Sequence, residues 1–280
     1  MPMSEAQSTN RCHWYAGQLV TGDTLMLSMH DPGLLFGATV FTTLRIYEND
    51  LDHPWTAWPS HCQRVARSLQ AFHWSAPDWT RVRQGAAQLA SAYPVLRVTI
   101  FPDGRELIVG RSLPPHLQTW QTQGVTAWVA DSPDFQRSLP DHKTGNYLAC
   151  WLALQAAQRA QAQAAILIDA QGHWLETSTG NLWGWVAGQW YTPPLAGAIL
   201  PGVLRSRLMQ GLQVQHQVVQ TCPWDATQVS QFTYLAYTNS VMAVVPIHTV
   251  LQGNASVNYN PDQGKTQQLT KAWQAGAQET

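Results

Sequence analysis

The sequence predicts an α/β protein with a smaller N-terminal domain and a larger C-terminal domain. Patterns typical of helices and of β-strands alternate along the chain, and its 280 residues suffice for two modest domains or one large one. The proline-rich segment 113–124 has the composition of a linker. We therefore place an N-terminal domain at 1–112 and a C-terminal domain at 125–280.

The N-terminal domain is expected to contain two β-hairpins and two helices. The first hairpin is predicted to turn around Thr21-Gly22-Asp23, because glycine and aspartate favour tight turns. A β-branched and aromatic run then predicts a strand whose alternation separates two sets of side chains. The sets are Phe41, Thr43, Arg45 and Tyr47 on one face and Thr42, Leu44 and Ile46 on the other. The remaining predicted elements are helices at 57–74 and 78–92 and hairpin strands at 95–101 and 106–110.

The C-terminal domain is expected to mix strands and helices in a similar way. Short apolar runs bounded by turn residues predict its strands, and longer runs rich in alanine, glutamine and leucine predict its helices. The predicted strands are 125–130, 164–169, 182–187, 214–219 and 232–237, and the predicted helices are 152–163, 203–212 and 261–275.

The charge balance gives no general attraction to nucleic acid or to an anionic membrane. The chain has 16 Lys and Arg against 17 Asp and Glu, a formal net charge of −1. It has no apolar run of membrane-spanning length and no basic segment followed by an apolar core near its N-terminus. We therefore expect a cytoplasmic protein that meets a small-molecule ligand locally.

Metal and nucleotide sites have little support in the sequence. The 4 cysteines are scattered, without the CxxC spacing of a zinc site, and the 10 histidines form no HxxxH or HExxH motif. We find no glycine-rich nucleotide motif and no GxSxG elbow. The 14 tryptophans could form a stacking surface for sugars or bases, but tryptophan is more often a core residue.

Lys143 is the first candidate for chemistry. It lies in the segment His142-Lys143-Thr144-Gly145-Asn146-Tyr147, directly before a predicted helix. The amide donors and the positive end of the helix dipole disfavour a cation there, so this location favours a neutral lysine amine. A neutral amine is a nucleophile that can form a Schiff base with an aldehyde.

Glu176 and a later glycine-proline turn provide two further features. Glu176 lies among threonine and serine hydroxyls with large apolar neighbours in sequence, surroundings in which a carboxylate needs a cationic partner such as a protonated pyridine nitrogen. The stretch 197–205 contains a Pro-Gly turn that leads into an amphipathic helix. Exposed amides at such a helix entry can bind a phosphate.

Together these segments resemble the fold-type IV pyridoxal phosphate enzymes, a family of branched-chain and D-amino-acid aminotransferases and 4-amino-4-deoxychorismate lyase. The motifs follow one another in the family's order from about Asp31 to about Ile247, which is most of the chain. The resemblance implies a two-domain fold with a barrel-like C-terminal sheet, pyridoxal 5′-phosphate as cofactor, and a homodimer.

The resemblance also implies the residues that bind the cofactor. Lys143 would form the Schiff base and Glu176 would bind the pyridine nitrogen. Arg64, which follows His61 with family spacing, would bind the phosphate; taken alone, Arg64 is a solvated helix charge. The other implied phosphate ligands are Leu200, Val203, Leu204, Asn239 and Ser240. For the last two, an ordinary Asn-Ser turn is the alternative.

The substrate side looks more like the lyase than the branched-chain aminotransferases. Thr43 would handle a proton at the substrate, although a threonine is also a common β-former. Arg45 lies beside Thr43 on the same face, and Arg97 or Arg105 could meet a substrate carboxylate. An aminotransferase remains the alternative activity, and a tryptophan-rich binding protein without catalysis is a third.

Three positions depart from the family pattern. Pro32 replaces a usual arginine, Ala38 stands where an aspartate is common, and Leu204 replaces a frequent threonine. The Leu204 change removes one hydroxyl from the implied phosphate site but leaves its backbone amides.

Overall fold

The structure, a computed structural model, describes residues 11–277 of the chain. It forms two compact units. The first unit contains the chain up to Leu113 together with Lys143–Asn146, and the second contains Pro114–His142 and the chain from Tyr147 onward. The first ten residues of the predicted N-terminal domain lie outside the described residues.

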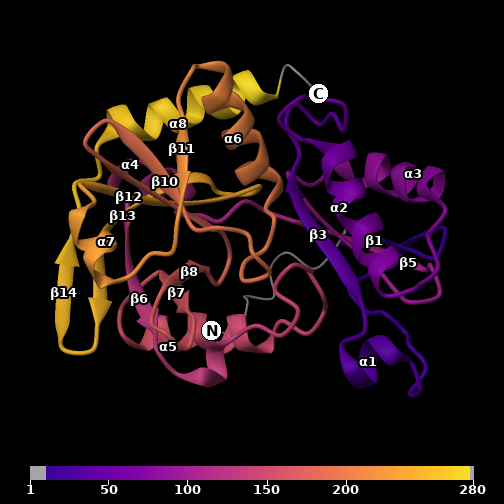
Figure 1. Cartoon of the computed structure of the whole chain (residues 1–280). Helices are drawn as coiled ribbons and strands as arrows, with labels where there is room; N and C mark the ends of the chain where they lie inside the picture. Colours follow the sequence, from indigo (N-terminus) through magenta and orange to yellow (C-terminus); the bar gives the residue numbers. More distant parts are fainter. Residues whose placement is uncertain (1–10, 278–280) are drawn as a thin grey trace. The chain divides into compact units, whose positions relative to one another are not determined.

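The first unit is built on a five-stranded antiparallel sheet in the order β2-β1-β5-β4-β3 (Figure 1, indigo to purple). Its strands are β1 (Cys12–Tyr15), β2 (Gln18–Thr21), β3 (Val40–Arg45), β4 (Val95–Ile100) and β5 (Glu106–Arg111). Its helices are α1 (Pro32–Phe36), α2 (Trp58–Ala71) and α3 (Trp79–Ala90).

One face of this sheet packs against α2 and α3, and this packing confirms the predicted alternation of β3. Thr42, Leu44 and Ile46 are buried on that face, with Leu44 fully inaccessible. They lie in or beside a core that also contains residues of α2 and α3, such as Val65 and Leu89. The alternate residues of β3, Thr43 and Arg45, are only partly buried.

The first hairpin differs from its prediction. The turn joins β1 to β2 at Ala16-Gly17, not around residues 21–23. Ala16 and Gly17 both have positive φ values, 47° and 87°, and an alanine in this region is unfavourable. The turn is held because Gly17 N donates a 2.8 Å hydrogen bond to the buried carboxylate of Glu106 on β5.

The second unit is built on a nine-stranded mixed sheet that closes on itself. The strand order is β11-β10-β9-β12-β13-β6-β7-β8, with β14 paired to β13, and β8 also pairs with β9. The last pairing makes the strands from β9 to β8 a closed barrel. The strands are β6 (Val125–Ala130), β7 (Ala164–Ile168), β8 (Trp174–Thr177), β9 (Asn181–Val186), β10 (Gln189–Thr192), β11 (Val219–Thr221), β12 (Tyr234–Asn239), β13 (Ala243–Gln252) and β14 (Ala255–Asn258).

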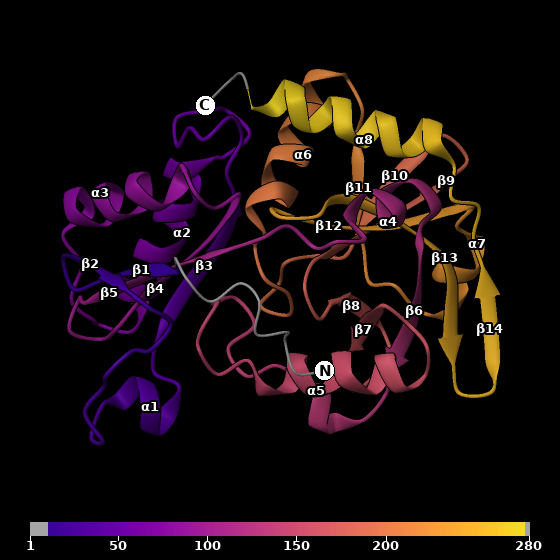
Figure 2. The same cartoon turned by 180° about the vertical axis from the view of Figure 1, so that it is seen from behind.

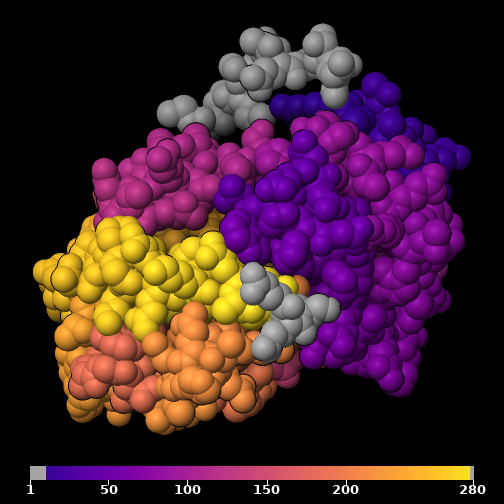
Figure 3. Space-filling view, turned by 90° about the horizontal axis from the view of Figure 1, so that it is seen from above, coloured from indigo at the N-terminus to yellow at the C-terminus, as the bar shows by residue number. Residues whose placement is uncertain are grey.

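Helices cover this barrel on more than one side. Its helical segments are α4 (Leu117–Gln123), the short 3₁₀ helix η2 (Pro133–Phe135), α5 (Leu148–Arg159), α6 (Val203–Val214), α7 (Ala226–Gln231) and α8 (Gln263–Gly276). α5 packs on β6 and β7 through small residues such as Ala153 and Ala157. α6 and α8 lie side by side (Figure 2), and α8 forms part of the outer surface of the unit (Figure 3, yellow).

Two further differences from the sequence predictions lie in this unit. Helix α6 continues to Val214, and the strand predicted at 214–219 is instead the short β11 at Val219–Thr221. The predicted linker at 113–124 contains helix α4. Among the residues that the structure describes, no helix is long and apolar enough to cross a membrane.

Candidate active site

In the first unit, the amine of Lys143 lies against the buried ring of Phe41 on β3. Its Nζ atom is 4.8 Å from the centroid of the Phe41 ring. The guanidinium carbon of Arg97 is 3.5 Å from the same centroid. Both distances are those of cation–π contacts, so Phe41 brings the predicted lysine and one predicted arginine together on one face.

The backbone of the lysine segment is held by β3. Phe41 N donates a 2.8 Å hydrogen bond to Lys143 O, and Gly145 N donates a 2.7 Å bond to Thr39 O. Helix α5 begins at Leu148, so its first-turn amides are separated from Lys143 by the intervening residues 144–147. The position of Lys143 therefore depends on strand pairing with β3, and the helix-dipole argument from the sequence has less weight.

Thr43 and Arg45 share this face with Phe41. The strand register pairs Thr43 with Arg97 on β4, and directly paired residues of antiparallel strands point to the same side of a sheet. Arg45 stacks its guanidinium 4.7 Å from the Tyr47 ring centroid. Burial raises the pKa of Tyr47 to about 12, with Arg45 acting in the opposite direction. A hydroxyl, an amine and two arginines thus gather on one face of the sheet.

Arg105, the third predicted substrate arginine, is engaged elsewhere. Its guanidinium forms ion pairs with Asp31 at 2.7 Å and with Asp103 at 2.6 Å, and it also donates to Tyr15 Oη. Burial lowers the pKa of Arg105, but these hydrogen bonds outweigh burial and raise it. This arrangement is typical of an arginine with a structural role.

Arg64 belongs to α2 and lies on the side of the sheet that packs against this helix. It is buried, and its Nη2 atom donates a 2.7 Å hydrogen bond to Thr42 Oγ1. The Nδ1 atom of buried His61 is 2.6 Å from the same oxygen. Arg64 is therefore an ordered residue of the core, not the solvated helix charge that its sequence position alone suggests.

In the second unit, Glu176 lies on β8 with its carboxylate buried. The backbone N–H of Leu200 donates to both carboxylate oxygens at 3.2–3.3 Å, and the side-chain amide of Asn181 donates at 3.4 Å. Glu176 is 4% exposed. Such an environment stabilises an ionised acid only together with a cation.

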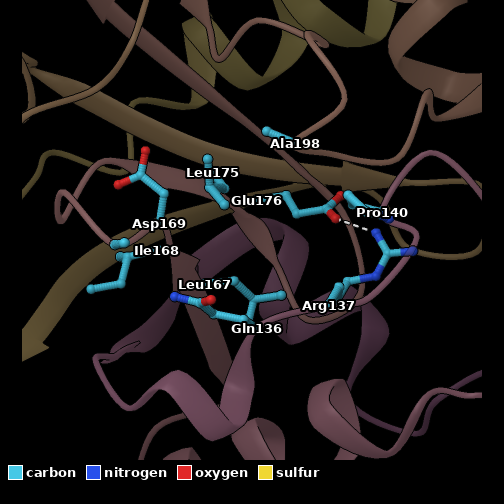
Figure 4. Close-up of a pocket in the computed structure, with 10 residues that line it drawn as sticks. Gln136, Arg137, Pro140, Leu167, Ile168, Asp169, Leu175, Glu176 and Ala198 are labelled. Carbon is cyan, nitrogen blue, oxygen red and sulfur yellow. Dashed lines mark hydrogen bonds and ion pairs between the residues drawn. The ribbon is translucent and has the colours of Figure 1, made fainter.

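That cation is Arg137, which the sequence did not single out. Its Nη1 atom donates a 2.5 Å hydrogen bond to Glu176 Oε1 (Figure 4). Burial opposes the charge of Arg137, but attraction to Glu176 raises its pKa above the ordinary value. The sequence indicated only that a buried glutamate needs a cationic partner. It did not identify Arg137 as that partner, because the two residues are 39 positions apart.

The turn before α6 has the geometry of an anion site. The N-cap of α6 is Gly202, and no side chain caps the helix, so the amides of Val203 and Leu204 lie in an uncapped first turn. A Cβ atom on Gly202 would lie 2.1 Å from Asn181 Oδ1, so a larger residue there would displace the Asn181 side chain. The backbone donors and the absent Cβ suit a phosphate group.

Asn239 and Ser240 follow β12, at the end of the barrel strand that neighbours β9. Asn239 Oδ1 accepts hydrogen bonds from the amides of Val241 and Met242 at 2.8–2.9 Å. The side chain of Asn239 therefore stabilises an Asn-Ser turn, which is the alternative to a phosphate-binding role. Its part in phosphate binding stays a prediction.

Comparison with known proteins relates this chain to one family. The model of amino-transferase class IV matches residues 39–250. Aminodeoxychorismate lyase from Vibrio harveyi is 26% identical over 234 residues, covering 78% of this chain and 84% of the lyase. Branched-chain-amino-acid aminotransferase from Salmonella typhimurium is 24% identical over 240 residues, covering 74% of this chain and 75% of that enzyme.

The fold agrees with these relationships. The pyridoxal-phosphate-bound structure of a hypothetical aminotransferase from Mycobacterium tuberculosis superposes with a TM-score of 0.79 at 16% identity, covering 94% of this chain and 98% of that one. This similarity confirms the predicted α/β class with a barrel-like sheet. Since the family model also spans most of the sequence, the chain belongs to the class IV aminotransferase family.

Proposed function

We propose that this enzyme is a pyridoxal-phosphate-dependent 4-amino-4-deoxychorismate lyase, which eliminates pyruvate and leaves 4-aminobenzoate. The observation that carries the proposal is the face of β3 where Thr43 lies beside Phe41, the ring that contacts the Lys143 amine and Arg97. A proton-donating hydroxyl, a base and a carboxylate-binding cation are the three groups that this elimination needs. The similarity to the Vibrio harveyi lyase supports the same activity.

Residues on the β3 face perform the chemistry at the substrate. Lys143 would hold the cofactor through its amine and, once free, would remove the proton from the substrate carbon that bears the amine. Thr43 donates a proton to the ether oxygen as its bond to the ring breaks, and the departing enol becomes pyruvate. Arg97 binds a substrate carboxylate, and Arg45 lies on the same face to assist.

Residues of the second unit bind the cofactor. Bound pyridoxal 5′-phosphate supplies an electron-accepting ring that stabilises the electron pair left after proton removal. Glu176 would hold the pyridine nitrogen and favour its protonated form. The amides at the start of α6 would bind the phosphate, and we assign Asn239 and Ser240 to the same group by their family positions. By its family position, Arg64 of the first unit is assigned to the phosphate as well.

The test supplies 4-amino-4-deoxychorismate without any keto acid and follows 4-aminobenzoate and pyruvate. Sustained, equimolar formation of both products is expected from a lyase. A strict requirement for added keto acid would contradict the proposal and identify an aminotransferase.

A branched-chain or D-amino-acid aminotransferase is the second candidate. The similarity to the Salmonella typhimurium aminotransferase, over nearly the same share of the chain as the lyase, favours it. In that reaction Lys143 would move a proton without any bond to oxygen breaking, so Thr43 would have no required part.

We also propose that the enzyme is a homodimer. Five large apolar side chains in and before α1 are at least half exposed: Met26, Met29, Leu34, Leu35 and Phe36. Exposed apolar groups of this kind are typical of protein interfaces. Sedimentation of the wild-type protein should give a dimer, and Phe36→Asp should shift it toward the monomer; a monomeric wild type would contradict this assignment.

A further inference from the structure

Arg137 makes three contacts with a single guanidinium, all within the second unit. Its Nη1 atom donates to Glu176 Oε1 at 2.5 Å, and its Nη2 atom donates to the carbonyl oxygen of His142 at 2.9 Å. The guanidinium carbon also lies 5.5 Å from the centroid of the Tyr147 ring. Arg137 thus links the acid on β8 to both ends of the segment that contains Lys143.

The geometry of the two hydrogen bonds requires an arginine. Each bond uses a different terminal nitrogen of one planar group, and a lysine has only one nitrogen to serve both acceptors. The side chains of Arg137 and Glu176 are only 8% and 6% exposed. Removing one member of such a buried pair leaves the other as an uncompensated charge.

The contact with the His142 carbonyl restrains the backbone next to Lys143. His142 immediately precedes Lys143, and Phe41 N holds the next carbonyl, that of Lys143. Two successive carbonyl groups of the chain are therefore fixed, the first by Arg137 and the second by β3. The first of these restraints is lost if the guanidinium is removed.

We propose that Arg137 is a positioning residue of the cofactor site: it pairs with the carboxylate of Glu176 and orients it, and it fixes the backbone that leads into Lys143. The proposal rests on the proposed roles of Glu176 and Lys143 toward pyridoxal phosphate. Arg137 acts through these two residues and has no assigned contact with the substrate.

A cavity beside the ion pair makes the proposal testable by chemical rescue. It has a volume of about 160 Å³ and is lined by Arg137 and Glu176 together with apolar side chains such as Leu167 and Leu175 (Figure 4). A cavity of about 150 Å³ accepts a molecule as large as benzene. With the Arg137 side chain truncated, the enlarged space can therefore accept methylguanidinium next to Glu176.

The experiment titrates apo protein with pyridoxal phosphate and follows the quenching of tryptophan fluorescence. Arg137→Ala should bind the cofactor at least about tenfold more weakly than wild type, since a hydrogen bond between charged groups contributes about that factor. Added methylguanidinium should restore much of the affinity. Methylammonium should restore less, because it lacks the planar group whose two terminal nitrogens serve both acceptors. Neither additive should alter the wild type.

Arg81→Ala is the matched control. Arg81 donates two hydrogen bonds to the fully buried Glu106 in the first unit, so its loss also breaks an ion pair with a buried acid. It should lower the Tm and leave the affinity for pyridoxal phosphate unchanged. If Arg137→Ala fails to fold, Arg137→Lys serves instead: it keeps the charge, and it should fold and still bind the cofactor more weakly.

The outcomes separate this inference from the proposed function. Wild-type affinity in a folded Arg137 variant, or a weakened affinity that methylguanidinium leaves unchanged, would overturn the positioning role. A wild type that binds pyridoxal phosphate but forms no 4-aminobenzoate would contradict the lyase activity and leave the role of Arg137 intact.

Discussion

The Lys143 amine and the Phe41 ring are in contact, with Nζ 4.8 Å from the ring centroid. Phe41 also contacts Arg97 on the neighbouring strand β4, and Thr43 lies two residues after Phe41 on the same face of β3. One strand thereby brings an amine, a hydroxyl and a guanidinium to the same face.

Thr43→Val should reduce lyase turnover by roughly 10²- to 10⁴-fold, the usual contribution of a positioned proton donor. Valine has the same shape as threonine but lacks the hydroxyl, whereas Thr43→Ser keeps the hydroxyl and should retain much of the activity. The measurement compares kcat for pyruvate release with the rate of amino transfer to a keto acid. Equal losses in both activities would remove Thr43 from the elimination step.

Arg97→Gln should raise KM for 4-amino-4-deoxychorismate about 10- to 100-fold, as expected when one charge-assisted hydrogen bond to a carboxylate is lost. Arg105→Gln is the matched comparison, because the Arg105 guanidinium is already engaged by Asp31 and Asp103. It should lower the Tm and leave KM unchanged. The opposite pattern, with KM raised only in the Arg105 variant, would assign the substrate carboxylate to Arg105.

Gly202→Ala should weaken binding of pyridoxal phosphate. The new Cβ would lie 2.1 Å from Asn181 Oδ1, and such overpacking typically costs about 1–3 kcal/mol. Because Asn181 donates to Leu200 O and to Glu176, its displacement disturbs both the turn and the acid. Fluorescence titration with the cofactor measures the change. Gly264→Ala, at the exposed start of α8, is the control, and equal affinities in the two variants would argue against a phosphate site at Gly202.

The stability of the protein should fall at acid pH in part through Asp31. Burial acts to raise the pKa of Asp31, but hydrogen bonds from Arg105 and Gly33 lower it on balance. A carboxyl with a depressed pKa contributes stability that is complete above its unfolded pKa of about 3.9 and is lost as pH falls through its folded pKa. Urea unfolding between pH 6 and the acid limit should show a shallower pH dependence for Asp31→Asn; parallel curves for variant and wild type would contradict this.

Elements specified by local pattern were predicted well from the sequence. The helices α2 and α3 and the hairpin of β4 and β5 lie where periodicity and turn residues indicated, because their apolar faces repeat at a fixed spacing. The alternation of β3 was likewise readable, and with it the shared face of Thr43 and Arg45. These features depend on neighbours within a few residues.

Features decided by distant residues were missed. The first hairpin turns at Ala16-Gly17 because Glu106, 89 positions from Gly17, binds its amide, and local turn preference pointed to residues 21–23. Arg137 was overlooked for the same reason, since its contact with Glu176 on β8 joins residues 39 positions apart. The burial of Arg64 against Thr42 is also a tertiary contact, which a helical sequence pattern does not contain.

The most direct test of the account is to locate the amine that holds the cofactor. The chain has three lysines, Lys143, Lys265 and Lys271. Borohydride reduction of the protein loaded with pyridoxal phosphate, followed by peptide mass spectrometry, should place the cofactor on Lys143 alone, and Lys143→Ala should carry no label and show no turnover. Label on Lys265 or Lys271 in the wild type, or turnover by Lys143→Ala, would contradict the central claim.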